Sequence, residues 1–376
     1  MRKGEEEAVD PRLHEDYPET QAPAPRANPH LVGHGEAERR LADAAASGAV
    51  AGAWLIGGPA GIGKTTLAYR LARHLLAGPA AGGLFGEATS GTLALDEADP
   101  VFTRVATGGH GDLLTIKLGF NEKTGKKRSV IDVDSVRKMA PFFHQSAGEG
   151  GWRFALIDGA ELMNPSASNA ALKLIEEPPP RSVVVLVSHA PARLLPTIRS
   201  RCRKLHLQPL ETAQVETLLA RYLPDLPDND RTVLAHLAEG SPGRALELDA
   251  LGGVALYREL VGTLASLPHL DVGRLHAFAE KMGRYGNEAA CGTVLEFLSG
   301  WLARLVRGSA GGQAPTAFVE GEAALIERFR GLPGLARWVD VWEKTARLRE
   351  RAESLNLDRK QVLLAVFGAL QAAARP

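Results

Sequence analysis

The sequence predicts an α/β domain with a parallel sheet, followed by a small helical lid domain and a helical collar domain. Three observations predict this order. A glycine-rich loop lies between a short apolar strand and a helix near residue 60. Strands and helices then alternate to about residue 208, which is typical of a doubly wound parallel sheet. After Pro209 only helical patterns follow, so we assign residues 209–252 to the lid and 253–376 to the collar.

The glycine-rich loop at residues 58–65 reads G-P-A-G-I-G-K-T, the pattern of a phosphate-binding P-loop. Lys64 is expected to reach the outer phosphates, and the Thr65 hydroxyl is expected to bind Mg²⁺. Residues 53–56 read as the apolar strand before the loop and 66–76 as the helix after it, so phosphate would lie at a helix N-terminus. The predicted nucleotide-binding residues of this stretch are Gly58, Gly61, Gly63, Lys64, Thr65 and Thr66.

Composition limits the class of protein. The chain has 376 residues, too many for one typical core, and its 45% hydrophobic content is ordinary for a soluble protein. Lys+Arg and Asp+Glu number 44 each, whereas a chain that binds nucleic acid strongly by itself is usually basic. The two cysteines, Cys202 and Cys291, exclude a disulfide scaffold and a Cys₄ zinc site and fit a reducing cytoplasm. The sequence contains neither a signal peptide nor an apolar run of 18 residues, so we expect a cytoplasmic protein without a membrane span.

The first half of the chain includes two regions with weak patterns. Residues 1–27 are polar and Pro-rich and predict a disordered tail, so the P-loop domain is expected over 28–208. Residues 78–111 read as an insertion to which no structure is assigned. Residues 114–120 predict a strand, with 129–133 as its returning partner. The turn between them carries Lys123, Lys126, Lys127 and Arg128, and a solvated hairpin tip is favoured over a DNA contact.

Three signals define the second half of the α/β domain. Residues 152–158 predict a strand ending in Asp158, the Walker B position at which a carboxylate orders water around Mg²⁺. Asn164-Pro165 marks a helix start, with Asn as N-cap and Pro at the first helical position. Residues 182–188 are almost wholly apolar and β-branched, which is typical of a central parallel strand. A further helix is expected to begin at Asp134 or Ser135.

Two long segments carry a family resemblance. LIDGAELMNPSASNAALKLIEEPP at 156–179 and LVSHAPARLLPTIRSRCRKLHLQPL at 186–210 resemble the AAA+ subunits of bacterial DNA polymerase III clamp loaders, with delta-prime subunits the most similar. GSPGRALEL at 240–248 and LNLDRKQ at 355–361 are similar too. The resemblance implies ATP with Mg²⁺ as ligand. It also implies a five-subunit ring whose motor ATPase and delta-type subunits, sliding clamp and primed DNA are the partners.

The resemblance also implies roles for single residues. Ser188 ends the strand that carries the sensor-1 residue in this family. Residues 200–202 match the family's S-R-C motif, whose arginine, Arg201 here, reaches the γ-phosphate on a neighbouring subunit. Arg244 falls where sensor 2 is expected, although an ion pair within its own helix explains it equally well. Residues 31–34 lie where the family lines the adenine pocket.

The chain departs from the family's motor subunits at two points. Gly159 follows Asp158, where an active ATPase has a Glu that polarises water, and Glu161 is three residues along the chain. Nucleotide is therefore expected to bind with slow or no hydrolysis. The zinc module is also missing, because no cysteine lies between Thr65 and Asp158.

We therefore expect a stator subunit that supplies Arg201 in trans and helps load the sliding clamp during DNA replication. The alternative is a motor-type AAA+ ATPase that itself hydrolyses ATP. A third interpretation, a general AAA+ protein that acts on protein substrates or DNA junctions, is less favoured because of the S-R-C motif and the all-helical third part.

Overall fold

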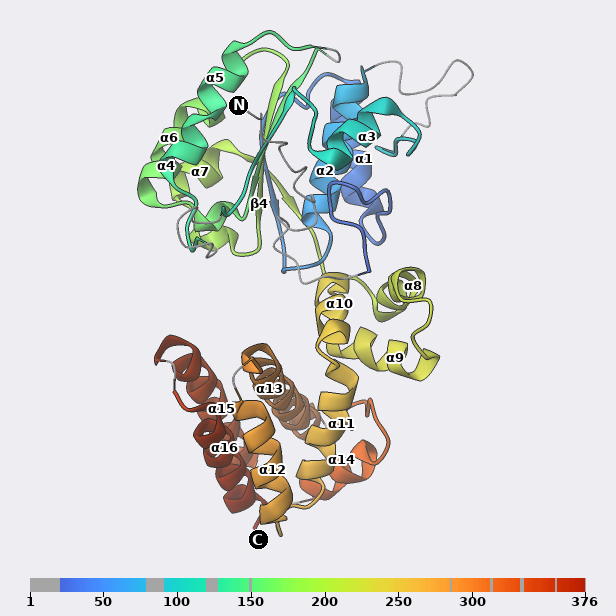
Figure 1. Ribbon diagram of the computed structural model, residues 1–376, viewed down its shortest axis with the longest axis vertical. Coiled ribbons are helices and arrows are strands. Elements are labelled where there is room, and N and C mark those ends of the chain that lie inside the picture. The colour runs from blue at the N-terminus through green and yellow to red at the C-terminus, as the bar shows by residue number, and fades with distance from the viewer. Residues whose placement is uncertain are drawn as a thin grey trace, which may run out of the picture. The chain divides into compact units, whose positions relative to one another are not determined.

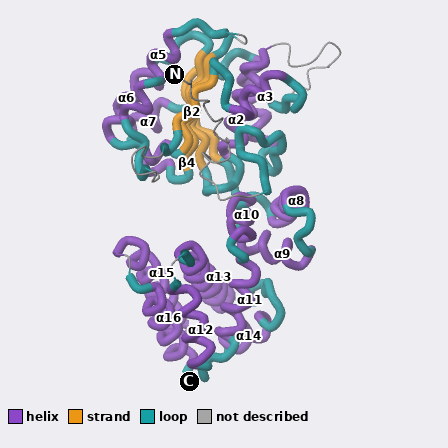
Figure 2. The backbone as a smooth tube through the Cα atoms, viewed as in Figure 1, coloured by secondary structure: helices purple, strands orange, loops and turns teal. Residues whose placement is uncertain are grey.

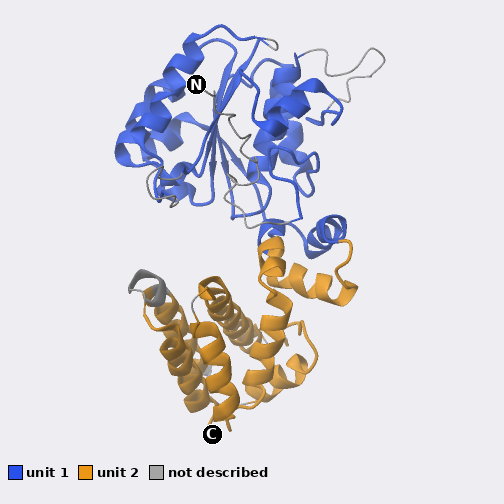
Figure 3. Ribbon diagram, in the orientation of Figure 1, with its two compact units in different colours: residues 1–223, 239–244 blue, residues 224–238, 245–376 orange. Residues whose placement is uncertain are grey.

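The computed structural model of the protein describes residues 21–78, 91–119, 128–148, 151–284, 286–311, 314–331, 335–355 and 357–375. The chain divides into two compact units (Figure 3). Unit 1 contains residues 1–223 and 239–244, and unit 2 contains residues 224–238 and 245–376. The three-domain division with boundaries at residues 28, 209 and 253 stays a prediction.

Unit 1 is built on a five-stranded parallel sheet with the strand order β2-β3-β4-β1-β5 (Figure 2). β4 lies at the centre and all seven of its residues are buried, as its β-branched sequence predicts. The strands are β1 (Gly52–Gly57), β2 (Leu113–Ile116), β3 (Arg153–Asp158), β4 (Ser182–Ser188) and β5 (Arg203–His206).

Helices cover both faces of this sheet (Figure 1). α1 (Gly35–Ala46), α2 (Lys64–Ala77) and α3 (Pro100–Thr107) lie on one face. α4 (Val133–Arg137), α5 (Met139–His144), α6 (Pro165–Glu176) and α7 (Pro196–Arg201) lie on the other. Alternate strand residues point into this second core, where Leu55, Ile157 and Leu186 pack with Ile175 and Ile198. The predicted α/β architecture is confirmed.

The region after β2 differs from the predicted hairpin. Residues 129–133 form no returning strand, because Ile131 instead makes an isolated parallel bridge with Met163 and is buried beneath α6. Asp132, rather than Asp134 or Ser135, caps α4, its carboxylate accepting a hydrogen bond from the Ser135 N–H at 2.8 Å. The predicted basic turn lies outside the described residues, except for Arg128.

The described part of the predicted N-terminal tail is packed rather than disordered. Two guanidinium nitrogens of the buried Arg73 donate hydrogen bonds to the carbonyl oxygens of Arg26 and Asn28, at 3.0 and 2.8 Å. Hydrogen bonds from a charged guanidinium are stronger than those between neutral groups, so these two contacts hold the segment against α2. Order therefore begins before the predicted boundary at residue 28, and residues 1–20 lie outside the described residues.

α3 gives structure to the end of the predicted insertion. Asp99 is its N-cap, accepting a hydrogen bond from the Val101 N–H at 2.7 Å, and Pro100 occupies the first helical position. The Asp-Pro pair at the start of α3 was visible in the sequence, but the helix that follows it has only eight residues. Residues 79–90 lie outside the described part of the chain.

Helices make up the remainder of the described chain. α8 (Thr212–Tyr222) belongs to unit 1, and α10 (Pro242–Ala250) crosses the division between the units. The helices of unit 2 are α9 (Asp228–Leu237), α11 (Gly253–Leu264), α12 (Val272–Gly283), α13 (Glu288–Gly311), α14 (Glu322–Arg330), α15 (Leu335–Leu355) and α16 (Arg359–Ala374).

The glycines and small residues at 308–312 suggest a flexible break between helices, but α13 continues through Gly311, and residue 312 lies outside the described residues. Its buried face, which includes Trp301 and Leu305, outweighs the cost of glycine in a helix, about 1 kcal/mol per residue. By length and composition α13 is the one helix of the described residues that could cross a membrane. Half of its apolar window is nevertheless buried inside the protein, as expected of a core helix.

Candidate functional site

The P-loop connects β1 to α2 and depends on glycine backbone conformations. Gly58 has φ +142° and Gly63, the N-cap of α2, has φ +100°, both in the region that favours glycine. A Cβ on Gly58 would also lie 2.4 Å from the carbonyl oxygen of Leu207. Thr66 is buried in the first turn of α2. The loop therefore leads directly into the N-terminus of α2, the end of a helix that favours anions, and phosphate binding there stays a prediction.

Lys64 is buried beside this loop, with 6% of its surface exposed. Its ammonium group donates a hydrogen bond to the carbonyl oxygen of Pro59. Burial lowers the pKa of Lys64 to about 8, while the nearby carboxylates of Asp158 and Glu161 act in the opposite direction. A buried ammonium beside a single carbonyl acceptor, that of Pro59, fits an anionic ligand, because phosphate oxygens would offset its desolvation.

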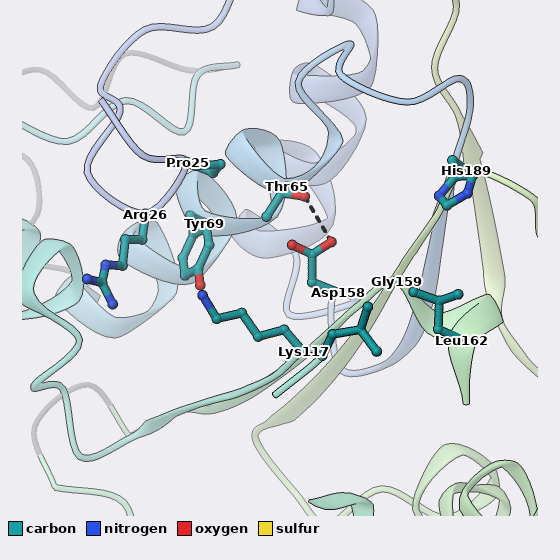
Figure 4. Close-up of a pocket in the computed structure, with 10 residues that line it drawn as sticks. Pro25, Arg26, Thr65, Tyr69, Lys117, Asp158, Gly159, Leu162 and His189 are labelled. Carbon is teal, nitrogen blue, oxygen red and sulfur yellow. Dashed lines mark hydrogen bonds between the residues drawn. The ribbon is translucent and has the colours of Figure 1, made fainter. Parts of the chain in front are cut away.

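Thr65 and Asp158 meet at the carboxyl end of β3. The Thr65 hydroxyl donates a hydrogen bond to Asp158 Oδ1 at 3.1 Å (Figure 4). Burial raises the pKa of Asp158, whereas the Thr65 hydrogen bond and the Lys64 charge lower it. The fold thus brings together the hydroxyl and the carboxylate that were predicted, 93 residues apart in sequence, to hold Mg²⁺. Oxygen donors of this kind are those that Mg²⁺ prefers.

A cavity of about 180 Å³ opens beside this pair (Figure 4). Its lining combines basic, acidic and aromatic side chains from the N-terminal segment, α2 and the ends of three strands. The lining residues are Pro25, Arg26, Thr65, Tyr69, Lys117, Leu118, Asp158, Gly159, Leu162 and His189. Among the described residues, no group of three or more His, Cys, Asp or Glu side chains is arranged to hold a metal ion.

Ser188, the predicted sensor-1 residue, does not line the cavity, whereas the next residue, His189, does. Ser188 is fully buried, and its hydroxyl accepts a hydrogen bond from the Ala190 N–H at 3.2 Å. His189, the next residue, lines the cavity instead. His189 also contacts the buried carboxylate of Glu161. Sequence reasoning missed His189, although a polar residue directly after an apolar strand, as at Asp158, was an available signal.

The segment that carries Arg244 packs on the P-loop within unit 1. Ser241 Oγ donates a hydrogen bond to the carbonyl oxygen of Ala60, and the Gly243 N–H donates to that of Gly61, both at 2.9 Å. Gly61 has φ +70°, and a Cβ there would lie 2.4 Å from Ser241 Oγ. The Arg244 backbone N–H donates to the same hydroxyl at 3.1 Å. The predicted sensor-2 residue therefore follows the stretch that touches the phosphate-binding loop.

Residues 31–34 lie against the same loop. His34 is buried, and its Nε2 donates a hydrogen bond to the carbonyl oxygen of Ile62 at 2.6 Å. Leu31 Cδ1 lies 3.7 Å from the position that a Cβ on Gly63 would take. The structure thus places the predicted adenine-pocket segment at the P-loop.

Arg201 lies apart from these residues, at the last position of α7. Its side chain is 42% exposed and forms an ion pair with Glu176, with Nε 2.5 Å from Oε1. α7 covers the face of the sheet opposite to α2, the helix that begins at Lys64 (Figure 1). The structure therefore groups Lys64, Thr65 and Asp158 and leaves Arg201 outside that group.

Comparison with known proteins shows a similarity to DNA polymerase III subunits. The family model described as DNA polymerase III, delta subunit, matches residues 33–211. The DNA polymerase III delta-prime subunit of Pseudomonas aeruginosa is 41% identical over 202 residues, which cover 53% of this chain and 56% of that protein. The gamma/tau subunit of Mycobacterium tuberculosis is 26% identical over 317 residues, 82% of this chain and 49% of that protein. The chain therefore spans about half the length of these relatives.

A solved structure of a DNA polymerase III gamma subunit-related protein from Thermotoga maritima covers 91% of this chain and 100% of its own, with 18% identity and a TM-score of 0.38. The residues that the family model matches include the P-loop, Asp158 and the S-R-C motif of this chain. Over its α/β part, this chain is therefore similar to the delta-prime subunits of bacterial DNA polymerase III.

Proposed function

We propose that this chain is a stator subunit of the DNA polymerase III clamp loader. It presents Arg201 to ATP bound on a neighbouring motor subunit and so helps load the sliding clamp onto primed DNA. The observation that carries the proposal is the exposed position of Arg201 on the face of the sheet opposite to α2. An arginine placed there serves a phosphate on another subunit, where it stabilises the charge that develops in phosphoryl transfer.

The chain's own P-loop is proposed to bind ATP with Mg²⁺. Lys64 would bind the outer phosphates, and Thr65 and Asp158 would hold Mg²⁺, which neutralises phosphate charge when bound. Gly159 supplies no carboxylate at the position where a motor subunit has its Glu. The chain therefore has the residues needed to bind nucleotide, but it lacks the glutamate that acts as the base in fast hydrolysis.

The partners follow from the same proposal. The motor ATPase and delta-type subunits would contact this chain in the ring, and the helices of residues 253–376 would form its share of the collar. The 44 acidic and 44 basic residues fit a subunit that shares DNA contact with its neighbours in the cytoplasm.

Replacing Lys64 by alanine tests the stator assignment against the motor alternative, which the intact P-loop and the Thr65–Asp158 hydrogen bond favour. We expect clamp loading by a reconstituted complex that contains the Lys64→Ala chain to stay within about threefold of wild type, because in a stator this site drives no essential step. Loading is measured as clamp retained on primed circular DNA. A loss of about 100-fold or more would instead assign the chain to the motor class.

The pH dependence of nucleotide affinity is a further prediction. Bound phosphate favours charged Lys64, whose pKa is lowered to about 8 in the free protein. Above pH 8 binding must therefore take up a proton, so the affinity for Mg-ADP should fall with rising pH, by at most about tenfold per pH unit. Calorimetric titration at pH 7, 8 and 9 measures it. The Lys64→Arg chain, charged throughout this range, serves as control, and a wild-type affinity as flat as that control would contradict the prediction.

A further inference from the structure

Glu161 is a buried carboxylate next to the candidate site. Gly159, with φ +78°, turns the chain from β3 into a short 3-10 helix, Ala160–Leu162, and this turn places the Glu161 side chain in the interior, fully shielded from solvent. Its Oε1 contacts His189 Nδ1 and accepts a hydrogen bond from the His189 backbone N–H at 3.3 Å. Its Oε2 is buried and has no hydrogen-bond partner among the described residues. A half-satisfied buried carboxylate is costly, and such groups occur where chemistry needs them.

The fold brings His189 to the same place from the adjacent strand. β3 and β4 are parallel neighbours with Asp158 paired to Val187, and the Gly159 N–H donates to the carbonyl oxygen of Val187 at 3.1 Å. The residues that follow the two strands are therefore held together. The His189 side chain is 49% exposed and lines the cavity that Thr65 and Asp158 also line (Figure 4).

The contact with Glu161 determines which ring nitrogen of His189 is available. A carboxylate accepts hydrogen bonds, so Nδ1 carries the proton in this pair. Nε2 of the neutral ring is then a proton acceptor. A base whose second nitrogen is held by a buried carboxylate has the arrangement that activates nucleophiles in many hydrolases.

We propose that His189, oriented by Glu161, is the general base for slow ATP hydrolysis at this chain's own P-loop. The proposal rests on nucleotide binding at Lys64. A water molecule attacks the γ-phosphorus and gives its proton to His189 Nε2. The bond from the γ-phosphorus to the bridging oxygen breaks, so that ADP and inorganic phosphate form, and the imidazolium returns its proton to solvent. Glu161 is a positioning residue that stabilises the imidazolium.

The charges around this pair suit the role. Lys64 and Lys117 are the cations that act on Asp158, and Asp158 and Glu161 are the carboxylates that act on Lys64. The carboxylate of Glu161 lies directly beside the His189 ring and fixes its orientation. His189, which follows β4, would thus act as the base in place of the glutamate that is absent at residue 159, after β3.

A purely structural role for the pair predicts a different result. Glu161 also binds the backbone N–H of His189, a contact that holds the loop whatever side chain stands at 189. His189→Ala therefore removes the imidazole and retains this anchor. Glu161→Gln retains the shape of the side chain and removes its charge.

The test uses the purified full-length chain and two readouts. Single-turnover release of phosphate from radiolabelled ATP is expected to fall about 100-fold in His189→Ala, with partial recovery on addition of free imidazole, and about tenfold in Glu161→Gln. Equilibrium affinity for Mg-ADP should stay within about threefold in both variants. His144→Ala, which removes an exposed histidine at the end of α5, is the matched control and should behave as wild type.

Nitrogen NMR of the chain without nucleotide gives an independent readout. The His189 signals, assigned from the spectrum of His189→Ala, should show a protonated Nδ1 and an unprotonated Nε2 near neutral pH, and Glu161→Gln should remove this preference.

Three outcomes would overturn the proposal. Turnover in His189→Ala equal to wild type, or wild-type turnover no higher than in Lys64→Ala despite binding of Mg-ATP, excludes His189 as the base and leaves the stator assignment intact. Absence of Mg-ATP binding removes the nucleotide site and this proposal together, while the role of Arg201 is tested separately in the reconstituted complex.

Discussion

Replacement of Arg201 by alanine is expected to lower DNA-stimulated ATP hydrolysis by the assembled clamp loader about 10³-fold or more. The affinity of this chain for its own nucleotide should not change, because Arg201 lies on α7, outside the group formed by Lys64, Thr65 and Asp158. Steady-state phosphate release by a complex reconstituted with the variant measures the effect.

The ion pair of Arg201 with Glu176 does not oppose this role. Both side chains are 42% exposed, and exposed ion pairs contribute between 0 and about 1 kcal/mol. The guanidinium can therefore leave Glu176 for a phosphate at small cost, and Arg201→Ala should unfold at nearly the wild-type temperature.

Two further variants make the Arg201 result specific. Arg201→Lys should restore little activity, because an ammonium group does not reproduce the planar fork of donors. Arg193→Ala removes another exposed arginine from the preceding 3-10 helix, Pro191–Arg193, and should leave hydrolysis unchanged. The finger assignment fails if Arg201→Ala and Arg193→Ala give the same rate.

Replacement of Glu322 by alanine is expected to destabilise unit 2 by about 3–5 kcal/mol. Glu322 is fully buried at the start of α14 and accepts hydrogen bonds from the Tyr257 hydroxyl at 2.5 Å, from Arg304 at 2.8 Å and from the Phe318 N–H at 2.6 Å. Arg304 also lies over the Phe318 ring, 3.7 Å from its centroid. Loss of the carboxylate would leave the Phe318 N–H without its acceptor, and it would leave the charge of the mostly buried Arg304 with only the Thr316 carbonyl and the Tyr257 hydroxyl as acceptors.

Urea unfolding of the full chain, followed by tryptophan fluorescence, measures this loss. The matched control is Glu320→Ala, which removes an exposed carboxylate two residues away and should cost less than about 0.5 kcal/mol. A Glu322→Leu, Arg304→Met double variant should recover much of the stability, since it removes both charges. A loss below about 1 kcal/mol in Glu322→Ala would show that this network carries little of the stability of unit 2.

Local signals account for what the sequence predicted correctly. The P-loop, the central strand β4 and the Asn164 cap of α6 each depend on a few adjacent residues, and the structure shows all three elements in place. The failures lie where distant residues decide the outcome. Ile131 pairs with Met163 instead of forming a hairpin, and the Arg73 guanidinium orders a segment that the sequence predicts to be disordered.

The candidate site shows the same division. Lys64, Thr65 and Asp158 belong to motifs that are recognisable in one dimension, and the structure brings all three together. The pair of Glu161 and His189 depends on the parallel register of β3 and β4, which places residues 28 positions apart in contact. The spacing of residues along the chain does not reveal the register of β3 and β4, so the contact between Glu161 and His189 could be found only in the structure.

The backbone conformation of Gly159 limits which residues can replace it. Its backbone has φ +78°, and a Cβ there would lie 3.1 Å from Leu162 Cδ1. A side chain in this left-handed conformation costs roughly 1–2 kcal/mol. One nucleotide substitution can turn a glycine codon into a glutamate codon, but the new side chain would stand on a strained backbone and crowd Leu162. A carboxylate at residue 159 would therefore require residues 159–162 to change conformation together, so no single substitution would introduce it without a cost in stability.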